Sequence, residues 1–122
     1  MKITKITSDK LGSNTYIVET DEGIIVIDPS VSIELITDVA KKAKKKIQYA
    51  LITHGHFDHC CTAAALQKQG VKILMSAEDY SMFEKGYDLS RFFGGNFQKF
   101  VPDMFISEGK YNLIGLEVEV IE

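Results

Sequence analysis

The chain has 122 residues, of which 45% are hydrophobic and 25% are charged, and its formal net charge is -3. This length bounds a single domain at most, and the composition is typical of a soluble globular protein. The acidic balance argues against a broad surface that binds phosphate. No stretch reaches the ~18 apolar residues that a membrane span needs. The amino-terminal residues lack the apolar core of a signal peptide.

The first part of the chain has the period-two pattern of strands. Residues 2–7 and 14–20 alternate apolar and polar side chains. Asp21-Glu22-Gly23 is a turn signal, and residues 24–27 are continuously apolar, which is typical of a strand buried on both faces. We therefore expect a hairpin whose second strand ends at Asp28-Pro29.

A helix is expected next. Ser32 can cap it, and Glu34 in the first turn suits the helix dipole. The lysines that follow, at positions 41, 42, 44, 45 and 46, are read as a solvated helix end. A nucleic-acid patch is the less favoured alternative, because neither aromatic residues nor arginines are interleaved with them.

The strand expected at residues 47–52 leads into a run that holds all three histidines, Thr-His-Gly-His-Phe-Asp-His. Imidazole nitrogen and carboxylate oxygen are both zinc ligands. His54 and His56 lie two apart and so point to one side of an extended segment. Asp58 and His59 fall where a helical pattern begins, so the ligands can split into two pairs. The alternatives are accidental surface histidines or a lone structural metal.

The rest of the chain alternates helices and strands. Helices are expected at residues 62–69 and from Ser76 to near Gly86, and strands at 71–75, 105–106, 111–114 and 116–120. This order predicts an α/β (α+β) fold, with a mixed sheet and helices on one face. The aromatic-rich residues 87–102 are either a binding loop or a plug that packs on the core.

The histidine run, together with the strand that ends at Asp28-Pro29, resembles the signature of the metallo-β-lactamase-fold hydrolases, most of all their glyoxalase II-like branch. The resemblance follows the whole chain in order. It implies that residues 1–122 are the N-terminal half of a single αββα sandwich domain.

The resemblance also implies the roles of individual residues. His54 and His56 would hold one metal ion, and Asp58 and His59 would hold a second. Asp58 would in addition be catalytic, by handling a proton during turnover. Asp28 would orient a metal ligand from behind the site, although a turn-forming Asp before Pro29 is nearly as good an interpretation. The cofactor expected is a pair of Zn²⁺ ions, with iron or manganese as alternatives.

The chain departs from the family pattern in two respects. Cys60, Cys61 and Thr62 stand where many relatives carry one residue and two glycines, so a thiol can lie near the metals, although a buried small side chain is favoured. The family completes its site with downstream residues that begin with a Gly-His-Thr-like turn, and no histidine follows His59. We therefore expect this chain to be part of a longer domain.

The function expected of the complete domain is hydrolysis of a small thioester or ester by hydroxide that a metal ion activates. This chain alone is expected to be inactive. One alternative is a non-catalytic module that self-associates through an uncovered sheet face or through residues 116–121. The other is an oxidoreductase like the mononuclear iron persulfide dioxygenases. The expected partner is a small-molecule substrate, not nucleic acid or membrane, and the adjacent cysteines fit a reducing cytoplasm.

Overall fold

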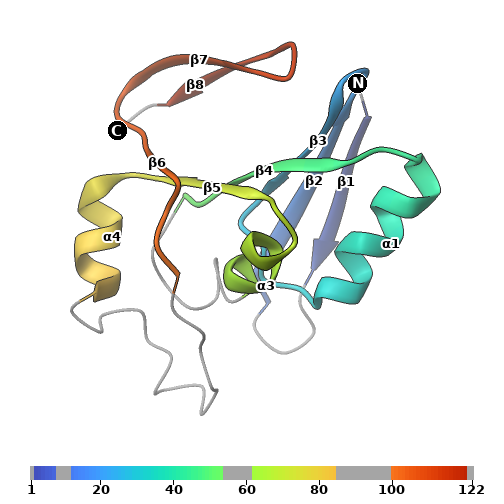
Figure 1. Ribbon diagram of the computed structural model, residues 1–122, viewed down its shortest axis with the longest axis horizontal. Coiled ribbons are helices and arrows are strands. Elements are labelled where there is room, and N and C mark those ends of the chain that lie inside the picture. Colours follow the sequence, from blue (N-terminus) through green and yellow to red (C-terminus); the bar gives the residue numbers. More distant parts are fainter. Residues whose placement is uncertain (1, 8–11, 54–61, 85–99, 121–122) are drawn as a thin grey trace.

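The structure is a computed structural model that describes residues 2–7, 12–53, 62–84 and 100–120. The predicted histidine motif, residues 54–59, and both cysteines therefore lie outside the described residues. Figure 1 shows the described elements in layers, with a β-hairpin on one side of a larger sheet and the helices on the other side. This is the mixed α/β arrangement that the sequence predicts.

The larger sheet has six strands in the order β1-β2-β3-β4-β5-β6. The pairs β1–β2 and β2–β3 are antiparallel, as the predicted hairpin requires. From β3 to β6 the strands are parallel, because helices connect them. The strands are β1 (Lys2–Thr7), β2 (Asn14–Thr20), β3 (Gly23–Ile27), β4 (Ile47–Leu51), β5 (Lys72–Met75) and β6 (Met104–Phe105).

The helices lie close to their predicted positions and are α1 (Ile33–Ala43), α3 (Ala63–Lys68) and α4 (Ala77–Glu84). Ser32 caps α1 as expected, since its hydroxyl accepts the Leu35 N–H at 3.4 Å. The helix is capped at its C-terminus by Lys44, which has a φ of 57°. Helices and sheet share a fully buried core that includes Ile36, Leu66 and Ile73. Among the described residues, no helix is long and apolar enough to cross a membrane.

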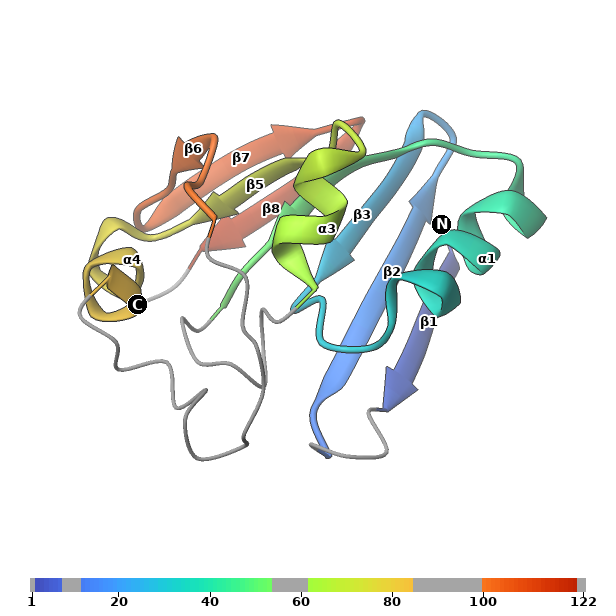
Figure 2. The same cartoon turned by 60° about the horizontal axis from the view of Figure 1, so that its bottom comes forward.

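The opposite face of the sheet is covered in part by the hairpin of β7 (Gly109–Leu113) and β8 (Leu116–Val120). Leu113 is buried there against a second apolar cluster with Val18, Ile25, Leu51 and Leu74. Figure 2 shows the hairpin behind β4 and β5, away from β1. Ile3 pairs with Val18 and so shares this face, but it stays 57% exposed. The outer strands on this face are therefore open.

Of the aromatic-rich stretch, residues 87–102, only residues 100–102 are described. Phe100 is 5% exposed and belongs to the core cluster between helices and sheet. For this residue the packing interpretation holds, while the rest of the stretch lies outside the described residues.

Replacing Leu113 by Ala tests whether the hairpin is part of the folded unit. The loss of a buried Leu side chain is expected to lower the free energy of unfolding by about 2–4 kcal/mol. Urea denaturation followed by circular dichroism measures this change. The matched control is Asn112→Ala, because the Asn112 side chain, next to Leu113 on β7, is exposed. This substitution should change the free energy of unfolding by less than about 0.5 kcal/mol. Equal effects of the two substitutions would contradict the packing.

Candidate metal centre

The candidate site lies at the carboxyl ends of the parallel strands, where open α/β sheets usually bind ligands. Asp28 directly follows β3, and Thr53 follows β4 after one further residue. The Asp28 N–H donates to the carbonyl of Leu51 at 2.9 Å, which keeps the two strand ends together. The first predicted metal ligand, His54, comes immediately after Thr53 in the sequence.

The Asp28 carboxylate is engaged by Thr53 through both of its oxygens. The Thr53 N–H donates to Oδ1 at 2.7 Å, and the Thr53 hydroxyl donates to Oδ2 at 2.5 Å. Asp28 itself is only 7% exposed. A buried carboxylate needs such donors, because burial without them is costly. Asp28 therefore holds the backbone of Thr53, the residue before the histidine motif, while its role in orienting a metal ligand stays a prediction.

The backbone of Asp28 is in the left-handed region, with a φ of 53°. For a residue with a side chain this conformation costs roughly 1–2 kcal/mol, although Asp tolerates it better than most. The Thr15 hydroxyl donates to the Asp28 carbonyl at 2.8 Å and also accepts the Ser30 N–H at 3.0 Å. These bonds hold the residues on either side of Pro29 in place, so the surrounding structure stabilises the unusual conformation.

Buried hydroxyl groups form a chain that ends on Asp28. The Ser13 hydroxyl donates to Ser30 Oγ at 3.1 Å, and Ser30 Oγ lies 3.1 Å from Thr15 Oγ1. Thr15 uses its one hydroxyl proton on the Asp28 carbonyl, so the Ser30 hydroxyl donates to Thr15. Each of the three hydroxyl groups, of Ser13, Ser30 and Thr15, therefore has a hydrogen-bond partner. Sequence reasoning missed this cluster, because Ser and Thr in a loop and a strand carry no distinctive pattern.

Thr62 anchors the other side of the motif to the same segment. Its N–H donates to the Pro29 carbonyl at 2.9 Å, and its hydroxyl donates to the Val31 carbonyl at 2.5 Å. The side chain is 9% exposed. Thr53 and Thr62 flank the histidine motif in the sequence, and residues 28–31 hold both of them. The hydroxyl of Thr62 thus makes a hydrogen bond that a glycine at this position could not make.

Comparisons with known proteins agree with this architecture. Residues 8–119 match the family described as the metallo-beta-lactamase superfamily. The chain belongs to the metallo-beta-lactamase superfamily. Membership in this superfamily implies that the fold binds divalent metal ions. The residues that would bind the metal, at positions 54, 56, 58 and 59, remain a prediction because they lie outside the described residues.

Individual relatives are similar over part of their length. A probable metallo-hydrolase of Streptococcus pyogenes is 37% identical over 48% of this chain and 25% of its own. The type 2 metallo-beta-lactamase of Bacillus cereus is 30% identical over 67% of this chain and 34% of its own. The crystal structure of TTHA1623 in a di-iron-bound form has a TM-score of 0.75 and 28% identity, over 92% of this chain and 57% of its own. The chain thus spans about a third or less of the two curated relatives, and 57% of the solved structure.

Replacing Thr53 by Val tests the link between Asp28 and the motif. The substitution keeps the shape of the side chain but removes the hydroxyl that donates to Asp28. We expect the free energy of unfolding to fall by about 1 kcal/mol and the affinity for Zn²⁺ to fall ~10-fold or more. Urea denaturation and competition with a chromogenic chelator measure these two quantities.

The matched control is Thr37→Val on α1, where the hydroxyl donates to the carbonyl of Ile33 within its own helix. This variant should retain the metal affinity of the unmodified chain. If both variants bind Zn²⁺ as the unmodified chain does, the Asp28–Thr53 contact has no role in positioning a metal ligand.

Proposed function

We propose that the complete protein is a glyoxalase II-like, metal-dependent hydrolase of a small thioester or ester. The observation that carries this proposal is the pair of anchors on residues 28–31, which hold Thr53 and Thr62 at the carboxyl edge of the sheet. This arrangement supports a motif presented at that edge. We also propose a cytoplasmic location, on the basis of the adjacent cysteines.

The donor set fits a divalent metal centre. His54, His56 and His59 offer three imidazoles, and Asp58 offers a carboxylate, which are ligands suited to zinc. Iron is the main alternative, supported by the di-iron form of the solved relative. A bound divalent ion supplies Lewis acidity and lowers the pKa of water toward neutrality. The chain's own contribution is to orient the ligands through Asp28 and to move a proton at the Asp58 carboxylate.

The substrate class rests on charge and on the resemblance. A formal net charge of -3 disfavours a polyanionic substrate such as nucleic acid.

Catalytic zinc sites typically keep three protein ligands for each ion, and His54 with His56 supplies only two. We therefore propose that the chain as given is inactive and that the activity belongs to a longer protein.

Metal analysis and thioester hydrolysis test this function. Plasma emission spectroscopy on the chain and on a longer form that includes any downstream ligands should find zinc in both, and thioester hydrolysis in the longer form alone. His56→Ala should lower zinc content and reduce hydrolysis ~100-fold or more, since catalysis by the metal would be lost. Asp38→Ala, an exposed acid on α1, serves as the control and should keep both. Full hydrolysis by His56→Ala would refute the mechanism.

The same analysis of metal content tests a second candidate function. One iron ion per chain, together with oxygen consumption in the presence of a persulfide, would favour an oxidoreductase like the persulfide dioxygenases. Zinc without oxygen consumption would favour the hydrolase.

We further propose that the chain self-associates through the open part of its sheet. The support is the exposure of Ile3 and Tyr16, 57% and 36%, on the face that the hairpin leaves uncovered. Sedimentation velocity should show a mass that rises with concentration. The double variant Ile3→Lys/Tyr16→Lys should remain monomeric, whereas Leu35→Lys, at an exposed site on α1, should associate normally. A monomeric unmodified chain at all concentrations would end this proposal.

A further inference from the structure

A groove lies at the opposite end of the strands from the candidate metal centre. It is bounded by the end of α1, the start of β4 and the connection from α3 to β5, and its volume is about 470 Å³. Ala40 and Val71 are buried and Ile47 is half-buried, so these apolar side chains form its base. This volume lies in the range of sites that bind small molecules.

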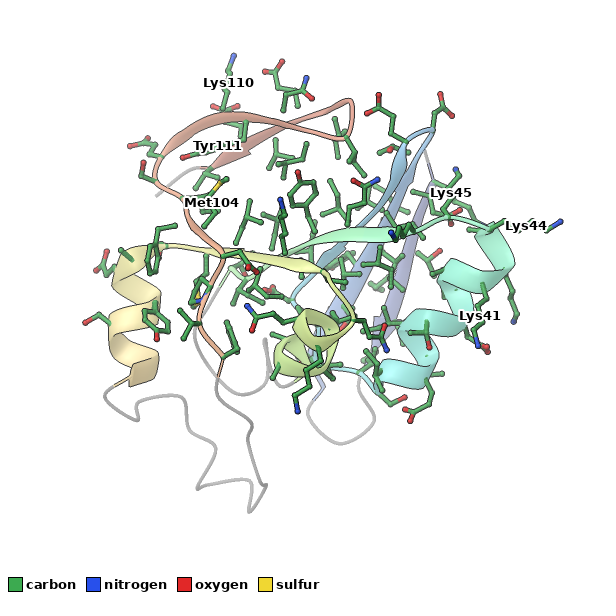
Figure 3. All side chains as sticks on the ribbon, in the orientation of Figure 1. Lys41, Lys44, Lys45, Met104, Lys110 and Tyr111 are labelled. Atoms are coloured by element: carbon green, nitrogen blue, oxygen red, sulfur yellow. The ribbon has the colours of Figure 1, made fainter. Side chains whose placement is uncertain are left out.

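Four lysines form the rim of this groove, Lys41, Lys44, Lys45 and Lys46. Three of them are exposed and Lys45 is half-buried. Figure 3 labels Lys41, Lys44 and Lys45 around the end of α1, where the chain passes toward β4. Within the described part of the chain, none of the four forms an ion pair. A chain with an excess of acidic residues thus gathers uncompensated positive charge around one hollow.

The helix dipole explains only part of this arrangement. It favours cations in the last turn of α1, where Lys41 lies. Lys45 and Lys46 follow the helix and lie on the segment that leads into β4. A solvated helix end also does not require an apolar base beneath the charges. The combination of base and rim is what a ligand with an apolar body and several negative charges would need.

We propose that this groove binds a small organic polyanion, with a compact apolar or aromatic body and at least two negative charges carried by phosphate or similar groups. The body would cover Ala40, Ile47 and Val71, and the anionic groups would meet the lysines. An ammonium group is a compact charge that suits phosphate and carboxylate oxygens. Among the lining residues there is no arginine or aromatic side chain for stacking bases, so a small molecule is favoured over RNA.

The groove is separate from the candidate metal centre. Strand β4 begins in the groove at Ile47 and ends at Leu51, next to Asp28. A strand of this length separates the two places by roughly 15 Å. Ligand binding in the groove can therefore be distinguished from binding to a metal ion by where it perturbs the chain.

The test uses the ¹⁵N-labelled chain and three probes. 1-Naphthyl phosphate and naphthalene-1,5-disulfonate carry an apolar body and two charges, and sulfonate is a weak ligand for metals. Inorganic phosphate carries charge alone. We expect both naphthalene probes to shift the amide signals of residues 44–47 and 69–71 in a saturable manner, and to bind at least ~10-fold more tightly than phosphate, a difference of about 1.4 kcal/mol. Shifts confined to other residues, or equal affinity for phosphate, would overturn the proposal.

A charge-matched pair of variants separates this groove from general electrostatics. Lys41→Gln/Lys46→Gln should weaken binding of the disulfonate ~10-fold or more, while Lys2→Gln/Lys5→Gln on β1 should leave it within about twofold. Equal weakening would overturn the proposal, as would tighter, groove-dependent binding of single-stranded RNA. If the groove variant fails to fold, the amide map of the unmodified chain still decides between the outcomes.

Discussion

The hydrogen bonds that Thr53 and Thr62 donate to residues 28–31 are the constraint on which the candidate site depends. The Asp28 carboxylate accepts two hydrogen bonds from Thr53. The backbone carbonyls of Pro29 and Val31 accept hydrogen bonds from the N–H and the hydroxyl of Thr62. Asp28 adopts a costly backbone conformation to make its contact, and Thr15 holds it there. A short segment after β3 thereby fixes both flanks of a motif that it does not adjoin in the sequence.

The sheet makes these hydrogen bonds possible because its close-packed core fixes the ends of β3 and β4. Ile24 and Val26 on β3 and Ala50 on β4 are completely buried, and the parallel pairing of these strands brings Asp28 beside Leu51. Close-packed interiors have low compressibility, so the ends of β3 and β4 are held at a fixed separation. Among the described residues, the helices cover one face of the sheet and the hairpin covers part of the other, which leaves the outer strands on that face open.

The two ends of β4 have opposite electrostatic character. At its carboxyl end lie the Asp28 carboxylate and the beginning of a run rich in imidazoles. At its amino end lysines surround an apolar hollow. We propose that the first attracts cations and the second anions, which is a reason to treat the groove as a site of its own. The separation follows from topology, since α1 and α3 each end shortly before the amino end of the next parallel strand, β4 or β5.

The sequence by itself determined the order of elements, the Ser32 cap, the mixed sheet and the histidine run, because hydrophobic period, capping residues and a concentrated ligand set are local signals. It also marked Asp28, through the resemblance of the strand that ends at Asp28-Pro29 to the family's pattern. Only the tertiary structure decided that Thr53 and Thr62 meet residues 28–31, and that the lysines ring a hollow. Those contacts join residues 25 to 33 positions apart, and no periodicity in the chain encodes them. The metal ligands themselves stay a prediction from the motif.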